Sequence, residues 1–131
     1  MKSIGHVRVR GVIANPLDRN LKQELEFIVD TGAIYTVIPQ SVAQKLQLKE
    51  VDKRRFKTDS GEVVEYPVSE AYITIQGKGV TSVVALAAEK TPILLGVTTL
   101  ELLGPQVDPA TGRLTPLELM ILQENTSTTT Q

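Results

Sequence analysis

The chain has 131 residues, of which 41% are hydrophobic and 22% charged, and a formal net charge of −1, as expected of one ordinary globular domain. The small net charge argues against a nucleic-acid or acidic-membrane partner, because such partners require a clear basic excess. The absence of cysteine excludes disulfides, thiol catalysis and cysteine-ligated metal, and the single histidine, His6, argues against a zinc site or a Ser-His-Asp triad.

No apolar run is long enough to cross a bilayer. The first residues, Met1 to His6, contain no apolar signal segment, and His6 itself lies in an alternating strand pattern that indicates a structural role. We therefore expect a cytoplasmic protein without a membrane partner.

The first part of the chain predicts two strands joined by a turn. Apolar and polar residues alternate from Val7 to Ile13, and Asn15 to Asn20 has the composition of a turn. Leu21 to Val29 alternates at first and becomes continuously apolar from Phe27. Because a continuous apolar run indicates a strand covered on both faces, the chain leaves the core at Asp30.

Asp30 stands at the point where chemistry is most concentrated in the sequence. It is followed by Thr31, Gly32 and Ala33, and an apolar run resumes at Val37. A carboxyl group at the end of a buried strand can have a pKa far from its solution value. An isolated Asp-Thr-Gly recurs by chance, but the apolar residues before it and the small residue after it make Asp30 a catalytic candidate.

The middle of the chain predicts a short helix and a hairpin. Pro39 opens a helical stretch from Gln40 to Leu46, and a basic run from Lys49 to Lys57 precedes a hairpin turn at Thr58 to Gly61. Beyond the turn the apolar phase reverses, which predicts a bulge or bend near Ser69 and Glu70.

A further turn at Gly77 to Gly79 precedes a buried strand from Val80 to Ala88. An apolar segment from Ile93 to Gly96 then leads into a second helix. Thr98 and Glu101 fit a capping box at its start, and Gly104 fits its C-terminal stop.

The last part of the chain predicts a turn at Asp108 to Gly112 and a strand pair from Arg113 to Leu122. The polar tail has nothing to bury. We therefore expect one domain over residues 1–122 and a disordered tail over residues 123–131.

Two motifs carry a resemblance to a known family. Phe27 to Ala33 and, downstream, Ile93 to Gly96 resemble the apolar-Asp-Thr-Gly-Ala loop and the apolar-Gly segment of the retropepsin-like aspartic proteases. The resemblance spans roughly residues 4–122. It is closest to the cellular prokaryotic-type members, which also have a Leu-Gly…Val-Asp-Pro-x-Thr-Gly-Arg-Leu stretch, here Leu103 to Leu114.

This resemblance implies a mostly β, closed-barrel acid-protease fold with one or two short helices, and an aspartic endopeptidase acting on peptides or proteins. Two carboxyl groups about 3 Å apart share one proton, because both cannot ionise. The ionised group activates a water and the protonated group donates to the scissile carbonyl, so neither a cofactor nor a metal is needed. Because one chain offers one convincing Asp, the enzyme is expected to be a homodimer with Asp30 from each subunit.

A second Asp-Ser-Gly, Asp59 to Gly61, does not fit the catalytic motif. It follows a basic rather than a buried strand, lies only 29 positions after Asp30, and is followed by Glu62. A hairpin turn is the better interpretation. The resemblance implies that this hairpin is the flap that closes over substrate. The predicted flap and substrate-binding residues are Phe56, Asp59, Ser60, Gly61, Val63, Val64 and Tyr66.

The resemblance also implies supporting roles around Asp30. Thr31 directs its hydroxyl across the dimer axis, and Gly32 allows the tight turn and points its N–H at the carboxylate. Ala33 replaces the hydroxyl residue of pepsin-like enzymes, which predicts activity at higher pH than for pepsin. Gly96 lets the downstream segment pack against the catalytic loop, and Val97 replaces the Arg of the retroviral enzymes, so their ion pair is absent.

Three alternatives remain beside the protease. Asp30 alone fits a structural Asp that caps nearby N–H groups, and the same fold fits a catalytically silent dimer that binds peptide. Nucleic-acid binding through Lys53, Arg54, Arg55 and Lys57 is disfavoured, because four charges beside a turn are typical of a solvated face.

Overall fold

The computed structural model describes residues 7–108 and 113–116. Its elements in chain order are β1 (Val7–Asn15), β2 (Asp18–Val29), β3 (Thr36–Pro39), α1 (Gln40–Lys45), β4 (Asp52–Lys57), β5 (Val63–Ile75), β6 (Lys78–Ala87), β7 (Leu94–Leu95), α2 (Val97–Leu103), β8 (Pro105–Asp108) and β9 (Arg113–Pro116). Strands dominate, so the prediction of a mostly β fold with short helices is confirmed.

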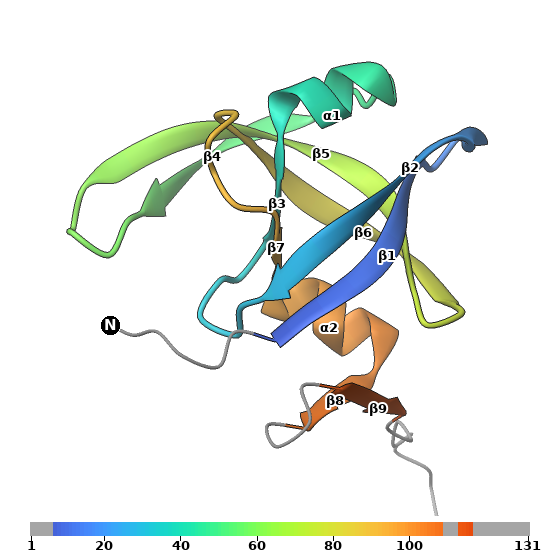
Figure 1. Ribbon diagram of the computed structural model, residues 1–131. Coiled ribbons are helices and arrows are strands. Elements are labelled where there is room, and N and C mark those ends of the chain that lie inside the picture. The colour runs from blue at the N-terminus through green and yellow to red at the C-terminus, as the bar shows by residue number, and fades with distance from the viewer. Residues whose placement is uncertain (1–6, 109–112, 117–131) are drawn as a thin grey trace, which may run out of the picture.

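Seven of these strands form one sheet in the order β1-β2-β7-β3-β6-β5-β4, and β1 also pairs with β5. The helices α1 and α2 lie at opposite ends of the strands, and β8 and β9 form a separate pair beside α2 (Figure 1). The sheet surrounds a core of alternating apolar side chains. Its fully buried large members include Ile13, Phe27, Ile38, Ile73 and Leu95.

The short strand β7 lies between β2 and β3. It pairs in parallel with β2 through Ile28 and Leu94, and antiparallel with β3 through Val37 and Leu94. The segment from Asp30 to Tyr35, which we call the Asp30 loop, connects the two strands that flank β7. This topology fixes both ends of the loop to the core of the sheet.

The predicted hairpin is formed by β4 and β5. β4 is the last strand in the sheet order and pairs with β5 from Asp52↔Val68 to Lys57↔Val63. The hairpin projects from the body of the molecule (Figure 1). Of the bulge or bend predicted near Ser69 and Glu70, the structure has no bulge, because β5 keeps one register with β6 from Val68↔Ala85 to Ile75↔Lys78. The strand instead curves without interruption (Figure 1).

The reversal of the apolar phase in β5 has a different cause. Val68 and Ser69 are consecutive in sequence and both are buried. At this point β5 exchanges its pairing with β4, which ends at Val68, for pairing with β1, which begins at Tyr72. The Ser69 hydroxyl donates to the Lys49 carbonyl, so a polar side chain is tolerated in the interior.

Two further predictions differ from the structure in position. The turn expected at Gly77 to Gly79 consists of Gln76 and Gly77, which have φ values of 51° and 83° and join Ile75 to Lys78 in a tight hairpin. The second helix begins at Val97 with Gly96 as its N-cap and no side-chain cap, so the predicted capping box is wrong. Gly104 ends that helix in the left-handed conformation, as predicted.

Near the end of the described chain, β8 and β9 form a short antiparallel pair. β8 and β9 pair from Pro105↔Pro116 to Asp108↔Arg113. The structure does not describe His6, residues 109–112 or residues 117–131, so the structural role of His6, the turn, the rest of the last strand and the tail stay predictions. Among the described residues no helix is long and apolar enough to cross a membrane.

Candidate active site

The Asp30 loop is held by backbone hydrogen bonds along its whole length. The Asp30 amide donates to the Leu95 carbonyl (3.1 Å), and the Ala33 amide closes a turn on the Asp30 carbonyl (3.1 Å). At the other side, the Val97 and Thr98 amides donate to the carbonyls of Ala33 and Ile34 (2.8 and 3.0 Å). The start of α2 therefore uses its unpaired N–H groups to fix the loop.

The Asp30 carboxyl group is accessible at the surface of the loop. Asp30 is half-buried, whereas Thr31 and Gly32 are exposed. The Gly32 amide donates to Asp30 Oδ1 at 2.9 Å, and a Cβ atom at position 32 would stand 3.2 Å from the same oxygen. A glycine at this position therefore leaves the carboxylate room to accept this hydrogen bond.

Gly96 allows the closest backbone approach around the site. A Cβ atom there would overlap the Tyr35 carbonyl and lie 2.7 Å from the Thr36 nitrogen. These are backbone atoms, which cannot move aside as the end of a flexible side chain can. The downstream motif thus packs directly against the end of the Asp30 loop.

A buried chain of hydroxyl groups lies beneath the loop. Thr36 Oγ1 accepts from the Gly96 amide (3.0 Å) and lies 2.6 Å from Thr99 Oγ1, which lies 2.8 Å from Ser82 Oγ. Ser82 Oγ is also 3.3 Å from the Val83 carbonyl. All three hydroxyl protons are used when Thr36 donates to Thr99, Thr99 to Ser82 and Ser82 to that carbonyl.

Sequence reasoning missed this chain of hydroxyl groups. In the sequence Thr36 directly precedes the apolar run that resumes at Val37, and Ser82 lies within the buried strand predicted from Val80 to Ala88. One signal was available in the sequence: a Ser or Thr at a position that the apolar pattern predicts to be buried. Such a residue indicates a hydrogen-bond partner, since buried hydroxyl groups need one. Their partners lie 17 and 63 positions apart, so no local pattern could pair them.

The predicted flap residues lie on the β4–β5 hairpin. Asp59, Ser60 and Gly61 form its tip, where the Thr58 amide donates to the Glu62 carbonyl (2.8 Å) and Gly61 has a φ of 89°. These tip residues are exposed.

The two faces of the hairpin differ in composition. Phe56 pairs with Val64 and Arg54 with Tyr66, and directly paired residues two positions apart share one face of the hairpin. Val63 lies on the opposite face and is 49% exposed. Of the predicted substrate-binding residues, Phe56, Val64 and Tyr66 are therefore brought together, and Val63 is not.

Tyr35, at the end of the Asp30 loop, joins that face of the hairpin. Its ring packs edge-on against Phe56, with centroids 5.7 Å apart and an interplanar angle of 75°. Phe56 in turn lies 5.8 Å from the Tyr66 ring. Tyr35 was not predicted as a site residue, because its partner is 21 positions away and no periodicity connects them.

Arg54 adds a charge beside this aromatic group. Hydrogen bonds to the Tyr35 side chain and then to Asp52 raise the pKa of Arg54. Hydrogen bonds from the Lys53 amide and from Arg54 lower the pKa of Asp52. Both side chains are exposed, so they form a solvated ion pair of small energetic value.

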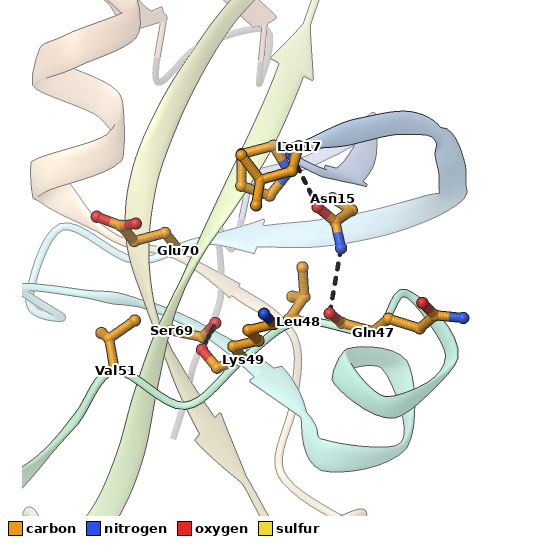
Figure 2. Close-up of a pocket in the computed structure, with 9 residues that line it drawn as sticks. Asn15, Leu17, Gln47, Leu48, Lys49, Val51, Ser69 and Glu70 are labelled. Atoms are coloured by element: carbon orange, nitrogen blue, oxygen red, sulfur yellow. Dashed lines mark hydrogen bonds between the residues drawn. The ribbon is translucent and has the colours of Figure 1, made fainter.

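A pocket of about 210 Å³ lies elsewhere on the molecule. Figure 2 shows its lining residues from the β1–β2 turn, the segment after α1 and the middle of β5. Asn15 Nδ2 donates to the Gln47 carbonyl (3.1 Å), and the Leu17 amide donates to Asn15 Oδ1 (2.8 Å). None of the predicted site residues lines this pocket. In the described part of the chain no group of three or more His, Asp or Glu could hold a metal ion.

Comparison with known protein families covers the part of the chain that contains the Asp30 loop. A family model described as aspartyl protease matches residues 5–99, a range that includes both the Asp30 loop and Gly96. No curated protein matches the chain.

Proposed function

We propose, from the premise that this chain belongs to the aspartyl protease family, that it is an aspartic endopeptidase of retropepsin type that works as a homodimer. In this proposal Asp30 of each subunit supplies one carboxyl group, and the pair hydrolyses peptide bonds through an activated water. The pairing of β1 with β5 supports a closed-barrel interpretation of the sheet.

The observation that carries the proposal is the position of the Asp30 carboxyl group. It is half-buried, it stands on a loop fixed by β7 and α2, and its Oδ1 already accepts the Gly32 N–H. This hydrogen bond holds the carboxyl group in one orientation, and a general base needs a fixed position beside the water that it activates. The reaction also needs a protonated carboxyl group as the acid, and a second Asp30 would supply it.

The exposed residues of the Asp30 loop support the proposal that a second subunit packs there. Ile34, a large apolar residue, is 66% exposed immediately beyond the Asp-Thr-Gly-Ala motif, and Thr31 is exposed beside Asp30. An isolated apolar side chain needs no explanation, but one next to a candidate catalytic carboxyl fits an interface or a substrate channel. In the proposed dimer Thr31 contacts the partner's loop and holds the two carboxyl groups in register.

The proposed mechanism requires no group from outside the protein. One carboxylate removes a proton from the water that lies between the pair, and the other carboxyl donates its proton to the scissile carbonyl oxygen. In the resulting tetrahedral diol, the carboxyl group that took the proton of the water donates it to the amide nitrogen, and a diol hydroxyl returns its proton to the other carboxylate. The C–N bond then breaks and releases an amine and a carboxylic acid. The β4–β5 hairpin is proposed as the flap, with Phe56, Val64 and Tyr66 facing the substrate.

The substitution Asp30→Asn tests the proposal directly. It preserves the shape of the side chain and removes the acid–base function, so peptide cleavage should fall by at least about 100-fold while the dimer persists. Asp18→Asn at the start of β2 is the matched control and should retain full cleavage. Binding of peptide without any Asp30-dependent cleavage would instead support the silent peptide-binding dimer. The cytoplasmic location and the absence of a nucleic-acid partner stay predictions from the sequence.

A further inference from the structure

Three aromatic rings connect the Asp30 loop to the hairpin. Tyr35 contacts Phe56, and Phe56 contacts Tyr66. All three side chains are half-buried, whereas the hairpin tip beyond Phe56 is exposed. The rings therefore join the Asp30 loop to the part of the hairpin that precedes its exposed tip.

The hairpin has few other constraints in this region. Its outer strand β4 is the last strand of the sheet and pairs only with β5 among the described elements. Many of its side chains are charged and exposed, which suits an unpaired edge but adds no packing. A ring packed edge-on supplies a directional contact that such an edge strand otherwise lacks.

Tyr35 also affects a second residue of the same strand. Its side chain raises the pKa of Arg54, which lies two positions before Phe56 on the same face of β4. Arg54 is also paired with Asp52. The contact that the structure shows between the Asp30 loop and this face of the hairpin is the packing of the Tyr35 ring on Phe56, with Arg54 beside it.

The opposite end of Tyr35 is rigid. Its backbone is packed against Gly96, and the following Thr36 accepts the Gly96 amide within the buried hydroxyl chain. The Tyr35 ring therefore positions the hairpin relative to the same loop backbone that holds Asp30.

We propose that Tyr35 is a positioning residue that sets the distance and orientation of the flap relative to the Asp30 carboxyl group. This inference rests on the proposed function for its catalytic consequence, although the mechanical part can be tested without cleavage. With Tyr35 in place, the hairpin is held at a fixed position relative to the Asp30 loop. Without it, the tip samples more open positions and substrate binds more weakly.

The mechanical part is tested by hydrogen exchange at the amides of Thr58 and Gly61, which are hydrogen-bonded within the tip. Tyr35→Leu, which removes the ring, should raise their exchange rates by about 2- to 10-fold. The Ile28 amide, bonded to the Ile93 carbonyl in the core, is the internal reference and should not change. Unchanged tip exchange, or an equal increase at Ile28, would overturn the proposal.

Further variants separate the ring from the hydroxyl group. Tyr35→Phe should keep most of the protection, and Phe56→Leu should reproduce the effect of Tyr35→Leu. Combining Tyr35→Leu with Phe56→Leu should add little to either single variant, because both remove one contact. Tyr72→Phe is the matched control, since Tyr72 also lies beside an arginine, Arg19, but far along the sheet, and it should leave the tip unchanged. Fully additive effects of the two Leu variants would contradict the proposal.

The catalytic consequence is read from steady-state kinetics. Tyr35→Leu should raise KM by about 2- to 10-fold with a smaller change in kcat. Tyr35→Phe, which keeps the ring, should have a KM close to that of wild type. A wild-type protein without cleavage would refute the proposed function but not the flap contact, which the exchange data judge separately. A fall in kcat at constant KM would refute the positioning role of Tyr35.

Discussion

Thr36 connects the strand that follows the Asp30 loop to the glycine that packs against it. Its hydroxyl is fully buried and accepts the Gly96 amide at 3.0 Å. Thr36→Val keeps the shape of the side chain but leaves the Gly96 amide without its acceptor, and the Thr99 hydroxyl keeps only its hydrogen bond with Ser82. We expect a loss of stability of about 1–3 kcal/mol, measured by urea unfolding.

Thr36→Ser provides the control for the hydroxyl group. It retains the oxygen and loses one methyl group, so it should cost less than Thr36→Val. A serine variant less stable than the valine variant would show that packing, rather than the hydrogen bonds, dominates at this position.

Gly96 is constrained by space rather than by an unusual backbone conformation. Its φ of −86° suits any residue, but an added Cβ atom would overlap the Tyr35 carbonyl. Gly96→Ala should therefore cost about 1–3 kcal/mol of stability through backbone displacement, measured by thermal or urea unfolding.

Gly32→Ala is the informative comparison, because its Cβ atom would meet only the Asp30 carboxylate at 3.2 Å. It should reduce cleavage with little change in stability. Equal destabilisation by the two alanines would contradict this assignment of roles.

At the scale of the element, α1 depends on a residue outside itself. The helix has no side-chain N-cap of its own. Glu89, after β6, accepts hydrogen bonds from the Ser41 hydroxyl (2.6 Å) and the Ser41 amide (2.9 Å). These two bonds, the hydroxyl first, lower the pKa of Glu89 below its ordinary value of 4.5. A carboxylate near the helix N-terminus also interacts favourably with the unpaired N–H groups.

The pH dependence of stability follows from the direction of this shift. Because the pKa of Glu89 is lower in the folded state, its stabilising contribution is complete above about pH 4.5 and is lost as the pH falls through the folded pKa. Glu89→Gln should therefore be less stable than wild type at pH 7, and the difference should shrink as the pH falls below about 4.5. Melting temperatures across this range test the prediction, and a stability difference that is constant with pH would contradict it.

The elements that the sequence predicted correctly have local signals. Alternation identified β1 and the first half of β2, Pro39 located the start of α1, and the Thr58 to Gly61 turn located the hairpin. The errors occurred where tertiary contacts decide. β5 changes neighbours at Val68 without a bulge, and α2 starts one residue before the predicted capping box because the Val97 and Thr98 amides bond the Asp30 loop instead.

The candidate site divides in the same way. Asp30, Gly32 and Gly96 lie in short contiguous motifs, so the sequence could identify them. Tyr35 acquires its significance only through Phe56, and Thr36 only through Gly96 and Thr99. Such contacts between residues distant in sequence become visible only when the sheet has brought the strands together.

At the scale of the whole molecule, one chain supplies one Asp30 loop, and the proposed chemistry needs two. The surface beside Asp30 includes exposed Thr31 and Ile34, and the loop behind it is fixed by backbone hydrogen bonds to β7 and α2. A rigid loop with an exposed apolar tip can form a symmetric contact in which the same surface serves both subunits. The carboxyl groups then face each other across the two-fold axis.

Subunit mixing tests this symmetry. When tagged Asp30→Asn protein is exchanged to equilibrium with an equal amount of wild type, about one quarter of the dimers should contain two aspartates. Activity should therefore fall to about a quarter of that of the same total amount of wild type, whereas independent sites would retain about half. Assay immediately after mixing, before exchange, is the control and should give the higher value. Native mass spectrometry measures the mixed dimers, and mixed dimers that cleave as well as the wild-type pair would show that a single Asp30 is sufficient, which the proposed mechanism excludes.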